Sequence, residues 1–148
     1  MRKPLKFKEN EPEEEIRSVF RSRGTYYLIS PMDVPGVYRL FRSRGEMASH
    51  FGVRYQSVEF VQVNALLFRY RNYDVWKLRF ESKEGRIRGN SVYVLFEMTG
   101  GKKVTLHRNI RNMAEYKGCN VESARRCLSK QDKHFFRDKD FVIRFRLL

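Results

Sequence analysis

Cysteine and histidine are scarce in this chain of 148 residues, which contains two cysteines and three histidines. Cys119 and Cys127 form no Cys-x-x-Cys motif, and no histidine stands near them at ligand spacing, so neither a disulfide framework nor a zinc site is indicated. We expect both cysteines to be small buried side chains. The sequence therefore predicts no metal site and no cofactor, and none of the histidines is predicted to be catalytic.

Long hydrophobic runs are also lacking. No apolar run approaches the roughly 18 residues that a membrane-spanning helix needs. The charged start of the chain is followed by no apolar stretch of signal-peptide length. The sequence predicts a cytoplasmic protein that does not enter a membrane.

Negative charge is under-represented, because 17 acidic residues stand against 31 basic ones and give a net charge of +14. Residues 1–8 carry +4 and residues 9–15 carry −5, so the remainder of the chain carries +15. Apolar residues make up 41% of the chain, which is enough to form a folded core. A folded body with this excess of positive charge attracts polyphosphates or acidic surfaces.

Residues 1–23 are predicted to form a basic and then acidic N-terminal arm. The glutamate run at 9–15 includes Pro12 and precedes an apolar segment, which is typical of the first turn of a short helix. No other grouping of acids, bases or nucleophiles suggests catalysis, so an enzyme is not predicted.

The sequence repeats itself at an offset of 66 positions. Residues 24–80 align with residues 90–146 without a gap and share ten identities. This pattern predicts a tandem duplication. Its parts are a first lobe at 24–80, a short polar linker at 81–89 and a second lobe at 90–148.

Each lobe has the pattern of a hairpin, two helical segments and a closing strand. The expected strands are 25–29, 37–41 and 75–80 in the first lobe and 91–96, 103–107 and 141–146 in the second. The fold class is therefore predicted to be α+β, built from tandem duplicated winged-helix-like units.

The helical segments carry a helix-turn-helix pattern. A small residue in the first helix lets the second helix cross closely, a glycine makes the turn, and two apolar residues pack the second helix back. These places are taken by Ala48, Gly52, Val58 and Val61 in the first lobe, and by Ala114, Gly118, Ala124 and Cys127 in the second. Two copies of the pattern in a strongly basic chain predict a protein that binds nucleic acid.

These segments resemble the helix-turn-helix family of DNA-binding domains, and in particular the small modules found beside the nuclease domain of phage homing endonucleases. The resemblance covers residues 45–80 and 111–146 and departs from the pattern at Lys117, where an apolar residue is usual. No His-Asn-His or Gly-Ile-Tyr nuclease motif is present. The resemblance implies a phage-type regulator of transcription or replication in a bacterial or phage-infected cell. It implies binding to double-stranded DNA as a monomer or weak dimer.

If the resemblance holds, the exposed positions of each second helix face the major groove. There Gln or Asn can pair with adenine, Arg with guanine and Glu with cytosine. The predicted base-reading residues are Arg54, Tyr55, Gln56, Glu59 and the neighbouring Phe60 in the first lobe, and Asn120, Glu122, Arg125 and Arg126 in the second. As alternatives, Tyr55 and Phe60 can pack against the closing strand or the other lobe, and both glutamates can pair with a nearby arginine.

Arginines beside the helical segments are predicted either to contact phosphates or to be solvated. They are Arg42, Arg44, Arg108 and Arg111 after the hairpins, and Arg69, Arg71 and Arg137 before the closing strands. A further alternative pairs Arg71 with Asp74, and Arg137 with Asp140, in local ion pairs that fix a turn.

Two other partners stay open. An acidic host protein can bind the same basic surface, in which case the chain is an adaptor or inhibitor. RNA shares the phosphate chemistry of DNA, and Tyr27, Tyr38 and Tyr93 suit base stacking if one sheet face is open.

Overall fold

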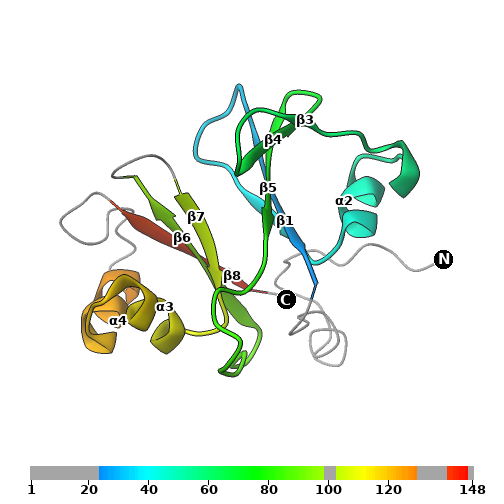
Figure 1. Ribbon diagram of the computed structural model, residues 1–148. Helices are drawn as coiled ribbons and strands as arrows, with labels where there is room; N and C mark the ends of the chain where they lie inside the picture. The colour runs from blue at the N-terminus through cyan, green and yellow to red at the C-terminus, as the bar shows by residue number, and fades with distance from the viewer. Residues whose placement is uncertain (1–23, 99–102, 130–139, 147–148) are drawn as a thin grey trace. The chain divides into compact units, whose positions relative to one another are not determined.

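The computed structural model describes residues 24–98, 103–129 and 140–146. The chain divides into two compact units at the boundary between Arg79 and Phe80. Each unit combines an antiparallel sheet with helical segments (Figure 1). This arrangement confirms the α+β class.

The first unit contains a five-stranded sheet. Its elements are β1 (Tyr26–Pro31), β2 (Arg39–Phe41), α2 (Arg44–His50), the 3₁₀ turn η1 (Tyr55–Ser57), β3 (Val61–Gln62), β4 (Leu67–Tyr70) and β5 (Tyr73–Leu78). The strand order is β2-β1-β5-β4-β3, so β1 lies between its hairpin partner and the closing strand β5.

The second unit contains a three-stranded sheet and a pair of helices. Its elements are β6 (Ser91–Glu97), β7 (Lys103–His107), α3 (Ile110–Lys117), α4 (Val121–Ser129) and β8 (Phe141–Arg146). The strand order is β7-β6-β8, so the first strand is again central.

The hairpin and the following helix start are the same in both units. Tyr27 stands opposite Phe41 in the first hairpin, and Tyr93 stands opposite His107 in the second, which preserves the offset of 66 positions. A polar residue then caps each helix. Ser43 Oγ accepts a hydrogen bond from the Glu46 amide at 3.1 Å, and Asn109 Oδ1 accepts one from the Asn112 amide at 2.8 Å.

The closing strands depart from that offset by one residue. Tyr27 lies opposite Lys77, whereas Tyr93 lies opposite Arg144. Asp74 and Asp140, which align in the sequence, consequently occupy different places. Gapless alignment is therefore wrong for the last part of the repeat, because the second unit has one more residue between its hairpin and its closing strand.

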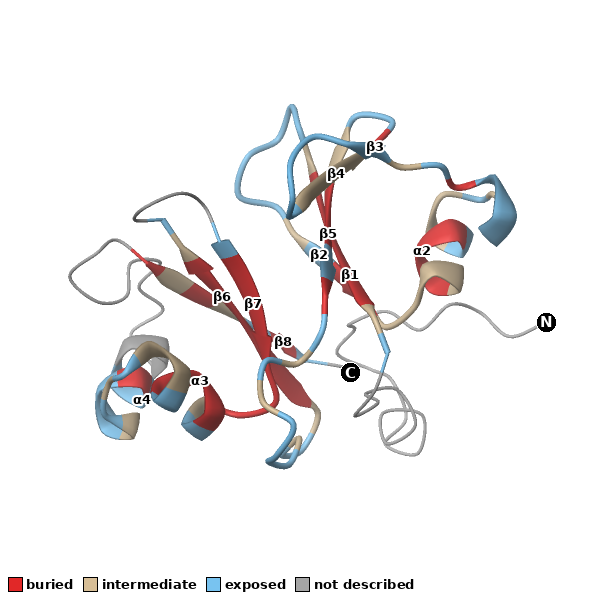
Figure 2. Ribbon diagram, viewed as in Figure 1, coloured by how far each residue is buried: buried red, intermediate tan, exposed pale blue. Residues whose placement is uncertain are grey.

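Helices cover one face of each sheet and bury its apolar side chains (Figure 2). In the first unit, Met47 and Ala48 of α2 pack in one cluster with Tyr27, Ile29 and Val75. In the second, Met113, Ala114 and Ala124 pack with Tyr93, Leu95 and Val142. The opposite faces are also apolar and buried, as Leu28, Trp76, Val94 and Phe145 show.

The predicted second helix is absent from the first unit. Residues 53–63 form η1 and β3 instead, and Val61, expected to pack against the first helix, is 68% exposed. Val58 is fully buried and Phe60 packs against the core. Inward residues two positions apart are the pattern of extended chain and not of a helix. Valines and an aromatic residue favour extended backbone here, so the helix-turn-helix prediction is wrong for this unit.

The predicted pair of helices is present in the second unit. α3 ends at Gly118, whose φ of 79° lies in the left-handed region that glycine favours. Ala114 and Ala124 are fully buried, so the helices meet at small side chains. Among the described helices, of which the nine-residue α4 is the longest, none could span a membrane.

Candidate nucleic-acid interface

The second helix of the pair, α4, exposes a polar face. Its inward residue Ala124 packs in the core, while Glu122, Ser123, Arg125 and Arg126 are exposed. The sequence favours a helix here because Glu, Ala and Arg are good helix formers and no proline interrupts them. The side chain of Cys127, predicted to pack at the same interface, lies outside the described residues.

Two of the predicted base readers on α4 already have roles within the helix. Asn120 Oδ1 accepts a hydrogen bond from the Glu122 amide at 2.7 Å, so this side chain caps the helix. Glu122 accepts a hydrogen bond from Arg125 at 2.9 Å in an exposed ion pair. The salt-bridge alternative for Glu122 is thereby confirmed. Arg126 and Arg125 are the cations that α4 presents to solvent.

The segment predicted to be a linker, 81–89, is held against the start of α3. The side-chain amide of Asn109 donates to the carbonyl of Arg86 at 2.8 Å. Gly85 packs so closely on Asn112 that a Cβ built there would lie 2.4 Å from its Oδ1. This segment therefore belongs to the second unit, and it places Arg88 beside the helix pair. Sequence reasoning missed Arg88 because it treated a basic stretch before a strand as a joint.

The first-unit residues predicted to read bases lie on no recognition helix. Arg54, Tyr55 and Gln56 lie at or in η1, and Glu59 follows it, all four exposed. Phe60 stacks on Tyr27 with ring centroids 5.9 Å apart and contacts Phe68 and Tyr70 edge-on. The packing alternative for Phe60 is therefore confirmed. These residues therefore do not form a second recognition helix.

Three of the four hairpin arginines are bound within the protein. Arg42 pairs with Glu46 at 2.7 Å, and Arg44 donates to the carbonyl of Val58. Arg108 is only 6% exposed, donates to the carbonyl of Ser82, and lies 4.5 Å from the ring of Phe80. The phosphate-contact prediction is wrong for Arg108, because the chain before β6 folds over its guanidinium. Arg111, on the first turn of α3, is exposed.

The predicted turn-fixing pair of Arg71 with Asp74 is not formed. Asp74 accepts a hydrogen bond from Arg69 at 3.1 Å, while Arg71 has a φ of 54° and its guanidinium lies 5.2 Å from the Tyr70 ring centroid. Asp140 pairs with Lys117 and accepts a hydrogen bond from the Met98 amide at 2.9 Å. Arg137 lies outside the described residues.

The tyrosines considered for base stacking do not form an open platform. Tyr27 and Tyr93 are 9% and 7% exposed and belong to the clusters beneath the helices. Tyr38 packs near Trp76, with ring centroids 6.2 Å apart. An open-sheet mode of single-strand binding therefore lacks its aromatic surface.

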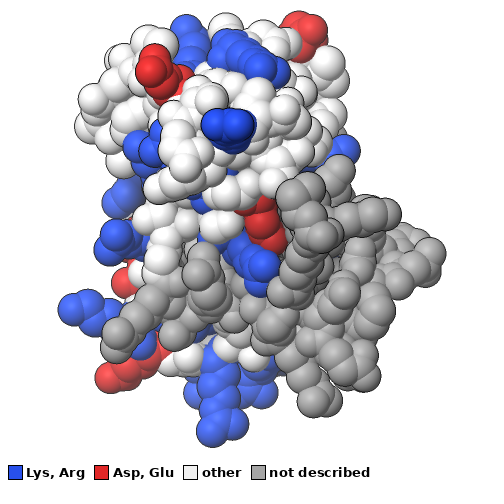
Figure 3. All heavy atoms as spheres, turned by 90° about the vertical axis from the view of Figure 1, so that its right-hand side faces the viewer, with Lys and Arg blue, Asp and Glu red and all other residues white. Residues whose placement is uncertain are grey.

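Basic side chains on the face drawn in Figure 3 are scattered among uncharged ones, with acidic side chains between them. They form no continuous patch there. Among the described helices, α4 presents two adjacent exposed arginines, Arg125 and Arg126, and α3 presents Arg111 in its first turn.

The imidazole of His107 is buried in the second unit. Burial lowers the pKa of His107 to about 4, so the ring is neutral near pH 7. It makes a hydrogen bond of 2.8 Å with Thr105 Oγ1 and packs 5.1 Å from the ring of Tyr116. His107 is thus part of the support for α3.

The comparisons with known proteins identify no family for this chain. No protein-family model matches this chain, and neither curated proteins nor solved structures give a match. The case for a function therefore rests on the geometry of the second unit and on the charge of the chain.

Proposed function

We infer that this chain is a sequence-preferring double-stranded DNA-binding protein that acts as a transcription or replication regulator. The observation that carries this proposal is the helix pair of the second unit. α3 and α4 are joined by a tight glycine turn, and α4 presents Arg125 and Arg126 on its exposed side. A helix with this presentation suits the major groove, where arginine pairs with guanine.

The charge of the chain supports the same proposal. A net charge of +14 attracts a polyanion at long range and drives counterion release from DNA. In this account Arg126 contributes to base reading, while exposed arginines such as Arg111 contribute to phosphate binding.

The two units are proposed to be tandem winged-helix-like copies of which only the second keeps a recognition helix. The shared hairpin register and helix caps support a common origin. The first unit has η1 and β3 where the second has α4. One recognition helix predicts a footprint of a single half-site, about five base pairs, rather than two sites one helical turn apart.

Fluorescence anisotropy with labelled nucleic acids tests the proposal. Duplex DNA, single-stranded DNA and RNA of equal length are compared at two salt concentrations. We expect duplex DNA to bind most tightly and its affinity to fall steeply as salt rises. Tighter binding to RNA or to single strands, or an affinity for duplex that does not change with salt, would contradict the proposal. Binding to none of the three, with capture of an acidic protein instead, would favour the adaptor alternative.

A further inference from the structure

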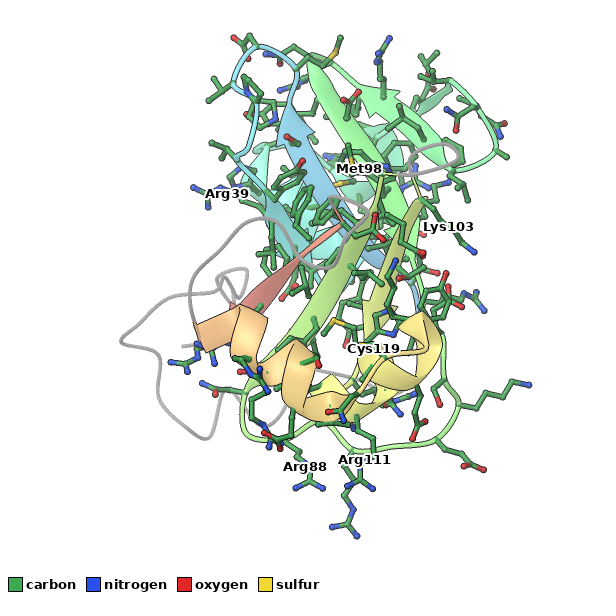
Figure 4. All side chains as sticks on the ribbon, turned by 90° about the vertical axis from the view of Figure 1, so that its left-hand side faces the viewer. Arg39, Arg88, Met98, Lys103, Arg111 and Cys119 are labelled. Carbon is green, nitrogen blue, oxygen red and sulfur yellow. The ribbon has the colours of Figure 1, made fainter. Side chains whose placement is uncertain are left out.

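A small cavity lies in the second unit between the start of β6, the first turn of α3 and the first turns of α4. Its volume is about 150 Å³, and three arginines line it: Arg88, Arg111 and Arg125. Tyr93 and Ile110 also line it. Figure 4 shows Arg88 and Arg111 beside each other next to the helix pair, pointing away from the ribbon.

The three arginines come from separate elements that the fold holds together. Arg88 precedes β6, Arg111 is in the first turn of α3, and Arg125 is in the second turn of α4. Asn109 fixes the first of these segments, because it caps α3 and also donates to the carbonyl of Arg86. The packing of the unit therefore brings the three elements together at this cavity.

The charge at the cavity is only partly balanced. Within the described residues, Arg88 and Arg111 have no acidic partner, and only Arg125 has one, Glu122 at 2.9 Å. Three guanidinium groups and one carboxylate leave an excess of two positive charges. Both helices also begin at this cavity, and their N-terminal dipoles add to the positive potential.

The corresponding place in the first unit is filled. Tyr27 matches Tyr93 in the hairpin register, and the ring of Phe60 stacks on Tyr27 at 5.9 Å. The guanidinium of Arg44 lies 5.2 Å from the Phe60 ring centroid and donates to the carbonyl of Val58. The packing of Phe60 and Arg44 thus distinguishes this place among the described residues of the first unit from the arginine-lined cavity of the second.

We propose that this cavity binds a phosphate monoester in its dianionic form. Such a group carries about two negative charges at neutral pH and three strong acceptor oxygens, which match the excess charge and the guanidinium donors that line the cavity. An internal phosphodiester of DNA carries one charge and is bonded on two sides, so it fits a concave site less well. The ligand is either a free phosphate ester, such as a nucleotide, or the terminal phosphate of a nucleic-acid strand. This binding does not depend on the proposed reading of duplex DNA.

Nuclear magnetic resonance titration of the full chain tests the cavity directly. Inorganic phosphate and then a nucleoside monophosphate are added at constant ionic strength, and the amides of Ile110, Arg111 and Val121 are followed. We expect saturable shifts at these amides. In the double variant Arg88→Gln/Arg111→Gln the dissociation constant should rise at least about 10-fold, because charge-assisted hydrogen bonds are lost.

The matched control is Arg39→Gln/Arg79→Gln, which removes the same charge from two exposed sites of the first unit that do not line the cavity. We expect its dissociation constant to stay within about 2-fold of the parent, since exposed charges that do not line the cavity are largely screened by salt. Shifts that do not saturate, or an equal weakening in the control, would overturn the proposal. All four substituted arginines are exposed, so both variants should keep the dispersed spectrum of the folded chain.

A second titration separates the two ligand sources. A short single strand with a 5′-phosphate is compared with the same strand ending in a 5′-hydroxyl. Tighter binding of the phosphorylated strand than of the nucleoside monophosphate assigns a nucleic-acid end. Equal binding of the two strands, together with saturable binding of the nucleotide, assigns a free phosphate ester.

Discussion

The ammonium of Lys117, at the end of α3, is held by the carboxylate of Asp140, immediately before β8. Asp140 is 1% exposed and also accepts the Met98 amide hydrogen bond, so one carboxylate joins α3, the end of β6 and the start of β8. Lys117 is the position at which the sequence departs from the helix-turn-helix pattern. Its partner explains how a cation can replace the usual apolar residue there.

Removing the charge of Asp140 should destabilise the second unit. In Asp140→Asn the Met98 hydrogen bond can persist, but Lys117 loses its ion pair in a largely buried place. We expect the free energy of unfolding to fall by about 2 to 4 kcal/mol, measured by urea denaturation. Glu122→Gln is the control, because it breaks an exposed pair and should cost less than about 1 kcal/mol. Equal costs for the two variants would show that the pair does not join these elements.

Acid should destabilise the protein through His107. Its folded pKa of about 4 lies below the unfolded value near 6.5, so the unfolded chain takes up a proton first as pH falls. The stabilisation from the neutral ring is complete above pH 6.5 and is lost progressively toward pH 4. In His107→Gln the loss of stability between pH 7 and pH 4.5 should be smaller by about 2 to 3 kcal/mol. Parallel pH profiles for the parent and the variant, from urea denaturation followed by circular dichroism, would contradict the assignment.

Arg108 should be important for stability and not for DNA binding. Its guanidinium donates to the carbonyl of Ser82 and packs on Phe80, so Arg108→Gln should cost about 1 to 3 kcal/mol of unfolding free energy. Arg144→Gln, at an exposed position of β8, should change stability by less than about 0.5 kcal/mol. The slope of log affinity against log salt should stay the same in Arg108→Gln. A slope lowered by about one unit would support the phosphate contact of Arg108 that the sequence predicted.

Local sequence patterns predicted the hairpin strands and the closing strands, which follow directly from alternation and β propensity, but they missed β3 and β4 of the first unit. They did not separate helix from strand at residues 58–63. A buried Val58 fits both the helical period and the strand period of two. Only the packing of Phe60 on the core and the exposure of Val61 show that the chain is extended here. The role of Arg108 was not predictable locally, since it depends on where the chain before β6 folds. The arginine cavity was missed for the same reason, because its three residues are far apart in the sequence.

The most direct test of the account compares α4 with the matching segment of the first unit. A preferred duplex is selected from a random pool, and the ratio of its affinity to that of random duplex is measured by competition at fixed salt. Arg126→Ala should lower this ratio roughly 5- to 150-fold, which corresponds to about 1 to 3 kcal/mol, since it removes the base contact proposed for α4. Gln56→Ala should leave the ratio unchanged, because Gln56 lies in a 3₁₀ turn. An unchanged ratio in Arg126→Ala, with circular dichroism showing a folded variant, would contradict the claim that α4 reads DNA.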